Sequence, residues 1–224
     1  MTNSPESPQA LGAPEPSRPV RSWVRSSPGT HAWLLIILGT SLVITFSSQG
    51  LEHFLLHRTS SNLHELTKHP AQSLLLSAFW IENPASLPSY VLLFEIVHAR
   101  AERWLGTLRW LFVVATAHIA ATLISQKVVL TRIENHDASR RMMHVVDIGV
   151  SYGLAASAGV LTYLVPGRWK WLYALALIAF FGVPLATGGT FTDLGHAIAL
   201  AIGFACWPLT RGRRSAAGVR AYEK

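Results

Sequence analysis

The chain is poor in charged residues and in cysteine, and each shortage excludes a class of protein. Only 14% of its 224 residues are charged, against roughly 25% in an ordinary soluble domain. Half of the residues (50%) are hydrophobic, and the mean hydropathy is +0.31. Because a soluble domain of this size cannot hide so much apolar surface, the composition argues against a soluble enzyme, a DNA-binding domain and a disordered protein. The single cysteine, Cys206, excludes an intrachain disulfide.

Apolar runs long enough to cross a bilayer recur along the chain. A spanning helix needs about 20 residues, and we predict six of them, near residues 32–48, 87–104, 108–126, 145–165, 170–187 and 190–209. The apolar stretch 71–81 covers only about half a bilayer, so we expect an interfacial or re-entrant piece there. The predicted fold class is therefore an all-α polytopic membrane protein with six transmembrane helices.

The two ends of the chain differ from this central part. Residues 1–30 hold six of the twelve prolines, which is typical of a disordered tail. This stretch is also too rich in proline for a cleaved signal peptide. We expect a disordered tail over 1–30, the six-span membrane domain over 31–209 and a basic tail over 210–224.

The Lys and Arg residues predict the orientation. With both ends inside, the inner segments hold 13 of the 19 basic residues and the outer loops hold six. Cytoplasmic loops carry such an excess, so we expect both termini in the cytoplasm, and a plasma-membrane location if the source is bacterial. The net charge of +7 is interpreted in the same way, and no nucleic-acid partner is expected.

Ionisable side chains within a predicted span are functional hypotheses by default. Glu95 and His98 could pair with each other on one helix face, although His98 lies close enough to the inner interface to be merely solvated. His118 lies near the middle of its span, where a hydrogen bond to a neighbouring helix backbone is the simplest explanation. In the first outer loop, His53 and His57 have a metal-binding spacing, but no third ligand has a suitable position. We therefore expect no metal and no cofactor.

Two helix starts carry residues that fit together chemically. The fourth span opens with Asp147, Gly149 and Ser151, and the sixth opens with Asp193 and His196. Both spans start at the outer side in the six-span arrangement, so Ser151 and His196 share a depth. Small residues at every fourth position let transmembrane helices approach closely; they are Gly149, Gly153 and Ser157 on one span and Ala199 and Gly203 on the other. A serine needs a base to become a nucleophile, and a neutral histidine can serve.

The spacing Gly149-x-Ser151-x-Gly153 also matches the nucleophile elbow of soluble α/β-hydrolases. That elbow requires a strand before the serine, and the flanks here are long apolar helical runs. We reject this alternative.

The order of these features resembles the rhomboid family of intramembrane serine proteases, over roughly residues 32–209. The resemblance rests on the six-span plan, on Ser151 and His196 at the outer ends of spans four and six, on the run Arg100–Arg109 after span two, and on the apolar piece around Ser73–Trp80. It implies that Ser151 is the nucleophile and His196 the base of a dyad without a third acid. It also implies transmembrane protein substrates within the lipid bilayer.

Four positions depart from the family's pattern. The residue after the serine is Tyr152 where the family usually has glycine, and the aromatic residue that often follows four positions after the serine is Ala155 here. The span-two His and Asn that help to hold the oxyanion correspond to Ser86 and Tyr90. These two residues, Gly149 and Asp193 are the candidate supporting groups, and Asp193 could either orient His196 or cap its helix.

Three other functions remain open. The chain could be a non-catalytic rhomboid-like protein that binds membrane clients or aids their quality control. It could carry haem between helices, with ligands drawn from His98, His118, His144 and His196, although their depths scatter. It could be a transporter with a helix broken at Pro184 and the following Gly188-Gly189, although the two halves of the chain show no matching pair.

Overall fold

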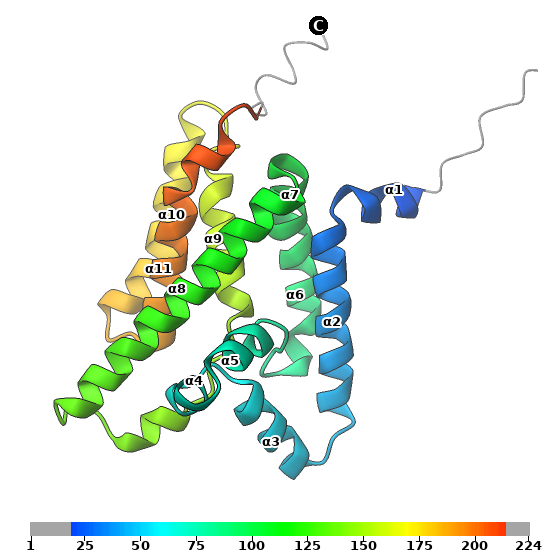
Figure 1. Cartoon of the computed structure of the whole chain (residues 1–224). Coiled ribbons are helices and arrows are strands. Elements are labelled where there is room, and N and C mark those ends of the chain that lie inside the picture. Colours follow the sequence, from blue (N-terminus) through cyan, green and yellow to red (C-terminus); the bar gives the residue numbers. More distant parts are fainter. Residues whose placement is uncertain (1–18, 214–224) are drawn as a thin grey trace, which may run out of the picture.

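The computed structural model describes residues 19–213, and all regular structure in that part of the chain is helical (Figure 1). The helices are α1 (Pro19–Ser26), α2 (Pro28–Thr45), α3 (Gln49–Thr59), α4 (Leu63–Lys68), α5 (Pro70–Ser77), α6 (Leu87–Leu93), α7 (Arg100–Leu105), α8 (Thr107–Glu134), α9 (Val150–Leu161), α10 (Trp169–Ala186) and α11 (Phe191–Ala205). Short 3-10 turns are η1 (Pro84–Ser86), η3 (Arg140–His144) and η4 (Trp207–Thr210), and η2 (Phe94–Ala99) is a π-helical segment.

Each predicted span has a helical counterpart, and the chain is an all-α polytopic membrane protein. The spans are α2, the continuous run α6–η2–α7, then α8, α9, α10 and α11. By length and composition alone, α2, α8 and α10 are long and apolar enough to cross a membrane, while α9 and α11 are shorter apolar helices. At 1.5 Å per residue the 28 residues of α8 extend about 42 Å. This helix therefore continues past the predicted end at residue 126.

The N-terminal prediction needs a correction. Helices α1 and α2 begin at Pro19 and Pro28, so residues 19–26 and 28–30 are helical and not part of a disordered tail. Proline is well suited to the first turn of a helix, where its missing N–H would have no partner in any case. The remainder of the predicted tail, and most of the basic C-terminal tail, lie outside the described residues.

The centre of the bundle is an aromatic cluster around one histidine. His98 has no exposed surface, and the rings of Trp33, Phe94 and Trp110 surround it. The Trp110 indole N–H donates to His98 Nδ1 at 3.1 Å, and Ser157 Oγ lies 3.0 Å from the same nitrogen. The prediction of a solvated His98 is therefore wrong.

Glu95 does not pair with His98 either. Its carboxylate lies 3.2 Å from Nε2 of His31 on α2. The two residues point to different neighbours because His98 sits on the core side of the π-helical segment, while Glu95 reaches the adjacent helix.

A buried carboxylate joins the starts of two helices. Glu102 on α7 is 1% exposed and accepts hydrogen bonds from the backbone N–H groups of Gly29 and Thr30, at 2.9 and 2.7 Å. It also accepts from the hydroxyls of Thr30 and Thr107, at 2.7 and 2.8 Å. Glu102 thus satisfies N–H groups that the first turn of α2 cannot pair within the helix.

Small residues bring α9 and α11 together, but on a different face of α9 from the one predicted. A Cβ added at Gly203 would lie 2.2 Å from the carbonyl oxygen of Ala156, and one at Gly159 would lie 2.8 Å from that of Leu200. The predicted stripe points elsewhere, since a Cβ at Gly153 would meet Trp33, Val114 and His98. Both the predicted stripe and the stripe through Ala156 and Gly159 consist of small residues, so their spacing alone could not determine which one faces α11.

The first loop, between α2 and α6, folds into α3, α4 and α5 and closes one end of the bundle (Figure 1). The predicted half-bilayer piece overlaps α5 from residue 71 onward. The Trp33 indole N–H of α2 donates to the carbonyl of Ala78, at the end of α5, at 2.7 Å. On the opposite side, Nε2 of His118 donates to the Leu74 carbonyl at 2.8 Å. The predicted backbone bond of His118 is therefore confirmed.

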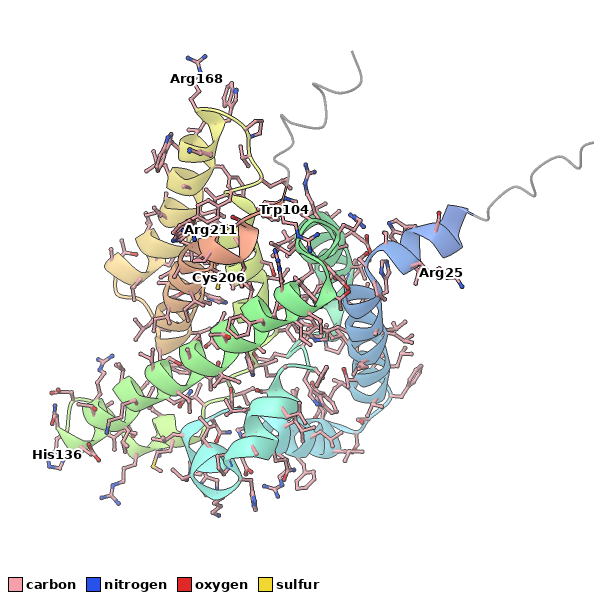
Figure 2. All side chains as sticks on the ribbon, turned by 45° about the horizontal axis from the view of Figure 1, so that its top comes forward. Arg25, Trp104, His136, Arg168, Cys206 and Arg211 are labelled. Atoms are coloured by element: carbon pink, nitrogen blue, oxygen red, sulfur yellow. The ribbon has the colours of Figure 1, made fainter. Side chains whose placement is uncertain are left out.

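The two ends of the bundle are distinct. Helix α1 and the η4 turn lie at one end, whereas α3, α4 and the start of α9 lie at the other (Figure 1). Arg168 projects from the first end and His136 from the opposite end (Figure 2). Both described chain ends thus lie on one side, as an even number of spans requires.

Candidate functional site

Ser151 and His196 meet between α9 and α11, near the end closed by the first loop. Nε2 of His196 lies 2.8 Å from Oγ of Ser151, although 45 residues separate them in the chain. Both side chains are half-buried, so the pair retains access from outside the core. In the tautomer protonated on Nδ1, the serine hydroxyl donates to Nε2, which is the bond that removal of the serine proton requires.

Two helix starts hold the pair in place. Gly149 is the N-cap of α9, which makes Ser151 the second residue of that helix. A Cβ at Gly149 would lie 2.0 Å from the His118 ring, and the Gly149 N–H donates to the Ser77 carbonyl at 3.1 Å. Glycine is therefore needed at position 149, because the imidazole of His118 on α8 packs directly against the backbone there.

The start of α11 is a capping box. The Asp193 carboxylate accepts from both the N–H and the hydroxyl of Thr190 at 2.8 Å, and the Asp193 N–H donates back to that hydroxyl at 3.2 Å. This is the reciprocal arrangement that satisfies the first N–H groups of a helix. Of the two roles left open for Asp193, its hydrogen bonds correspond to capping.

Two aromatic rings enclose the imidazole of His196. The Tyr152 ring lies edge-on at 5.2 Å between centroids, with 70° between the planes. The Phe181 ring of α10 lies at 5.6 Å. Both separations lie in the range in which aromatic pairs attract.

The other predicted supporting residues lie apart from the pair. The Ser86 hydroxyl donates to the Asn83 carbonyl at 2.6 Å, and Tyr90 lies half-buried at the margin of the hydrophobic core. Within residues 19–213, no hydrogen bond or ring contact joins either side chain to Ser151 or His196. The structure therefore brings Ser151, His196 and Gly149 together and leaves Ser86 and Tyr90 outside.

A buried polar network beside the pair was not predicted. The Tyr152 hydroxyl donates to Oδ1 of Asp147 at 2.9 Å, and the Gln126 amide donates to Oδ2 at 3.0 Å. Tyr152 has no exposed surface and Asp147 is 2% exposed. In the sequence, the only signal of this network is the tyrosine directly after the serine, which by itself indicates only a departure from the family's pattern.

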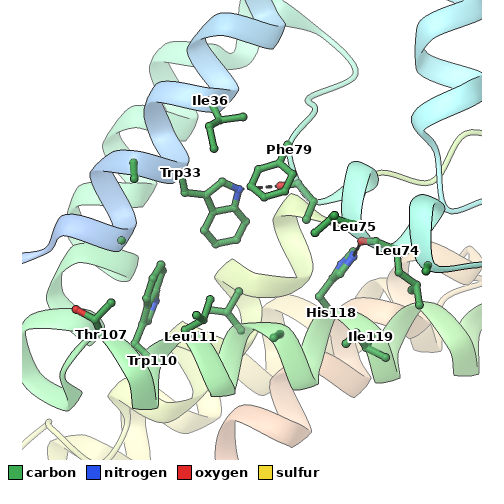
Figure 3. A pocket seen from close by; sticks show the side chains of 16 residues that line it. Trp33, Ile36, Leu74, Leu75, Phe79, Thr107, Trp110, Leu111, His118 and Ile119 are labelled. Atoms are coloured by element: carbon green, nitrogen blue, oxygen red, sulfur yellow. Dashed lines mark hydrogen bonds between the residues drawn. The ribbon is translucent and has the colours of Figure 1, made fainter.

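An apolar cavity of about 530 Å³ lies between α2, α5 and α8 (Figure 3). Trp33, Trp110 and Phe79 contribute its aromatic lining, and His118 stands at one end with its ring turned to the Leu74 carbonyl. Neither Ser151 nor His196 lines it. This cavity suits an apolar occupant and is separate from the serine–histidine pair.

The histidines considered as haem ligands each have a different neighbour. Within the described residues, no ring contact joins any two of His98, His118, His144 and His196, and His144 instead stacks near His64 at 4.5 Å. This arrangement gives no support to paired axial ligands.

The histidines of the first loop form a close pair. The His53 and His57 rings lie 4.1 Å apart between centroids. Burial, reinforced by the charges of His53 and His144, lowers the pKa of His57 below its ordinary value. Across residues 19–213, no group of three or more His, Cys, Asp or Glu side chains is arranged to hold a metal ion.

Comparison with known proteins adds one finding. A family described as "rhomboid-like protein" matches residues 22–216, which is most of the chain. No match was found among curated proteins or among solved structures.

Proposed function

This chain belongs to the family of rhomboid-like proteins, and from that premise we propose that it is an intramembrane serine endopeptidase that cleaves transmembrane protein substrates. The observation that carries the proposal is the 2.8 Å contact between Ser151 Oγ and His196 Nε2. Such a pair within a helical membrane bundle has the geometry of a nucleophile and its base. No third acid is invoked, because the hydrogen bonds of Asp193 go to Thr190.

The proposed reaction follows from this geometry. His196 Nε2 takes the Ser151 hydroxyl proton while Oγ attacks the carbonyl carbon of the scissile peptide. The tetrahedral oxyanion then collapses, the C–N bond breaks, and His196 gives its proton to the departing amine. Water, activated by the same histidine, hydrolyses the acyl-enzyme and releases Ser151.

The oxyanion needs a donor near Ser151. The backbone N–H of Ser151 belongs to the first turn of α9 and so has no partner within the helix. We assign it as the principal donor. Removing one oxyanion donor costs roughly 100- to 1,000-fold in rate, so a site without the side chains of Ser86 and Tyr90 is expected to turn over slowly.

The orientation belongs to the same proposal. We place both termini in the cytoplasm, so that the pair lies near the outer face, in the plasma membrane if the source is bacterial. The lipid bilayer and transmembrane proteins are the expected partners. No cofactor or nucleic acid takes part.

The apolar cavity favours a second candidate function. A hollow of about 530 Å³ between α2, α5 and α8, lined almost wholly by apolar side chains, could receive the hydrophobic part of a membrane client. In that case the protein would bind clients or aid their quality control without cutting them. Ser151 would then be one more small packing residue.

Covalent labelling distinguishes the two functions. A fluorophosphonate or isocoumarin probe should attach to Ser151 in the wild type and not in Ser151→Ala. His196→Ala should label about 10²–10⁴-fold more slowly, because the hydroxyl stays but has lost its base. His53→Ala, in the first loop and outside the site, is the matched control and should label normally.

Two other labelling results would count against the proposed protease. Equal labelling of Ser151 with and without His196 would contradict the dyad. Folded wild-type protein that never labels at Ser151, while still retaining membrane clients, would favour the non-catalytic function.

A further inference from the structure

Tyr152 stands directly beside the proposed base and is completely buried. Its ring meets the His196 ring edge-on at 5.2 Å. On the opposite side, the Tyr152 ring lies 6.4 Å from that of His118. The tyrosine therefore occupies the space between a helix of the core and the imidazole that does the proposed chemistry.

The neighbouring sequence is adapted to this ring. A Cβ added at Gly195 would lie 2.6 Å from three atoms of Tyr152, including its hydroxyl oxygen. Contacts below 3.0 Å are essentially never seen for real Cβ atoms. The residue immediately before His196 must consequently be glycine for Tyr152 to lie where it does.

The far end of the ring is fixed by hydrogen bonds. Its hydroxyl donates to Asp147 Oδ1 at 2.9 Å. The Asp147 backbone is held in turn by the first outer loop, since its N–H donates to Ser60 Oγ at 2.8 Å and its carbonyl accepts from the Ser61 N–H at 2.9 Å. Gln126 on α8 fixes the other carboxylate oxygen at 3.0 Å.

His196 itself has few other constraints. Its Nε2 faces Ser151, and within residues 19–213 no hydrogen bond is made through its Nδ1. Its ring also contacts the rings of Tyr152 and Phe181, at 5.2 and 5.6 Å between centroids. A base that can rotate away from its nucleophile loses the alignment on which the rate depends.

We propose that Tyr152, anchored by Asp147, is a positioning residue that holds the His196 imidazole with Nε2 toward Ser151. This inference rests on the proposed function, because it assumes that His196 is the base. On this inference Tyr152 acts in the site and not only in packing. The hydrogen bonds of the first outer loop to Asp147 then also help to align Ser151 and His196.

The kinetic test compares three variants. Tyr152→Leu removes the ring, Tyr152→Phe keeps the ring but loses the bond to Asp147, and Tyr163→Phe is the matched control. The Tyr163 hydroxyl donates to the Phe204 carbonyl at 2.7 Å, so the control removes a comparable bond between the α9 region and α11 away from His196. The measurements are the maximal rate of fluorophosphonate inactivation, the probe concentration at half-maximal rate, and the unfolding temperature.

We expect Tyr152→Leu to lower the maximal inactivation rate roughly 10- to 100-fold, in line with a misplacement of about 1 Å. The half-saturating probe concentration should stay unchanged. The maximal inactivation rate of Tyr152→Phe should lie between those of Tyr152→Leu and the wild type, and that of Tyr163→Phe should equal the wild-type rate. In a His196→Ala background, Tyr152→Leu should have no further effect, because the two residues act through one group. If Tyr152→Leu lowers the inactivation rate by the same factor with and without His196, the proposal is overturned.

A spectroscopic measurement keeps this inference separate from the proposed function. Nitrogen-15 histidine spectra identify the His196 signals as those missing in His196→Ala. We expect a single tautomer in the wild type and in Tyr163→Phe, and averaged or broadened signals in Tyr152→Leu. If that change occurs although Ser151 never labels, the positioning role stands and the proposed function fails. Unchanged His196 signals in folded Tyr152→Leu would overturn the positioning role whatever the labelling shows.

Discussion

The contact between α9 and α11 makes Gly203→Ala the most informative single substitution for the architecture. A Cβ at this position would lie 2.2 Å from the Ala156 carbonyl oxygen and 2.9 Å from the Cα of the same residue. Both are backbone atoms, so no side chain can turn aside. Ordinary van der Waals contact begins near 3.4 Å, and the two helices would have to separate by about 1.2 Å at this point.

That displacement reaches the proposed site. His196 lies two turns before Gly203 on the same helix, and its Nε2 is 2.8 Å from Ser151 Oγ. If the whole displacement is transmitted, the distance becomes about 4.0 Å, beyond the range of a hydrogen bond. Overpacking of this kind typically costs about 1–3 kcal/mol in the free energy of unfolding. We therefore expect Gly203→Ala to lower both the unfolding temperature and the rate of Ser151 labelling.

Matched controls are available in the same chain. A Cβ at Gly39 on α2, or at Gly182 on α10, would have no neighbour within 4 Å. Alanine at either position should be neutral or should stabilise by up to about 1 kcal/mol through helix propensity. Thermal unfolding in lipid nanodiscs, together with probe labelling, measures both effects. If Gly203→Ala unfolds and labels like Gly39→Ala, the close approach of α9 and α11 is wrong.

Three further predictions follow from other parts of the molecule. Glu102→Ala should lower the unfolding free energy by at least about 2 kcal/mol, because it leaves several buried donors unpaired; Thr107→Ala removes only one of these bonds and should cost less in the same unfolding assay. In a Cys206→Ser background, new cysteines in the segment 130–140 should react with an impermeant reagent outside intact cells, and reaction of residues near 103–107 would contradict the topology. Because the pKa of His57 is lowered in the folded protein, the unfolded chain binds more protons, so the first loop should lose stability as the pH falls through 6.5. Limited proteolysis at pH 7.5 and 5.5 tests this, and His57→Gln should reduce the difference.

Much of the architecture could be predicted because its signals are local. Apolar runs of about 20 residues locate spanning helices, and each predicted span has a helical counterpart. The closeness of Ser151 and His196 could also be inferred, because each lies near the start of a helix that begins at the same end. Depth along a helix follows directly from counting residues.

Rotation about a helix axis could not be inferred in the same way. On α9, the stripe through Gly149, Gly153 and Ser157 and the stripe through Ala156 and Gly159 are both small, so either could have met α11. Which one does so depends on large side chains of other helices, such as Trp33 against Gly153. For the same reason, the sequence does not show which way the Tyr152 side chain points. Its neighbour Gly195 lies 43 positions further along the chain.

His98 illustrates a related difficulty. The nearby arginines Arg100 and Arg103 indicated an interfacial position, yet successive helical residues point about 100° apart. One side of this segment faces polar surroundings while His98 faces Trp33 and Trp110. Neighbouring charges therefore predict the depth of a residue but not the face on which it lies.

The carboxylate of Glu102 has a consequence for how the protein is made. The N–H groups of Gly29 and Thr30 that it accepts precede it by 73 and 72 residues. At a synthesis rate of about 5–20 residues per second, Gly29 and Thr30 join the growing chain about 4–15 s before Glu102 does. During that interval the start of the first span must rely on water or lipid headgroups for its unpaired N–H groups. The first turn of α2 therefore gains these hydrogen bonds only after the second span has been synthesised.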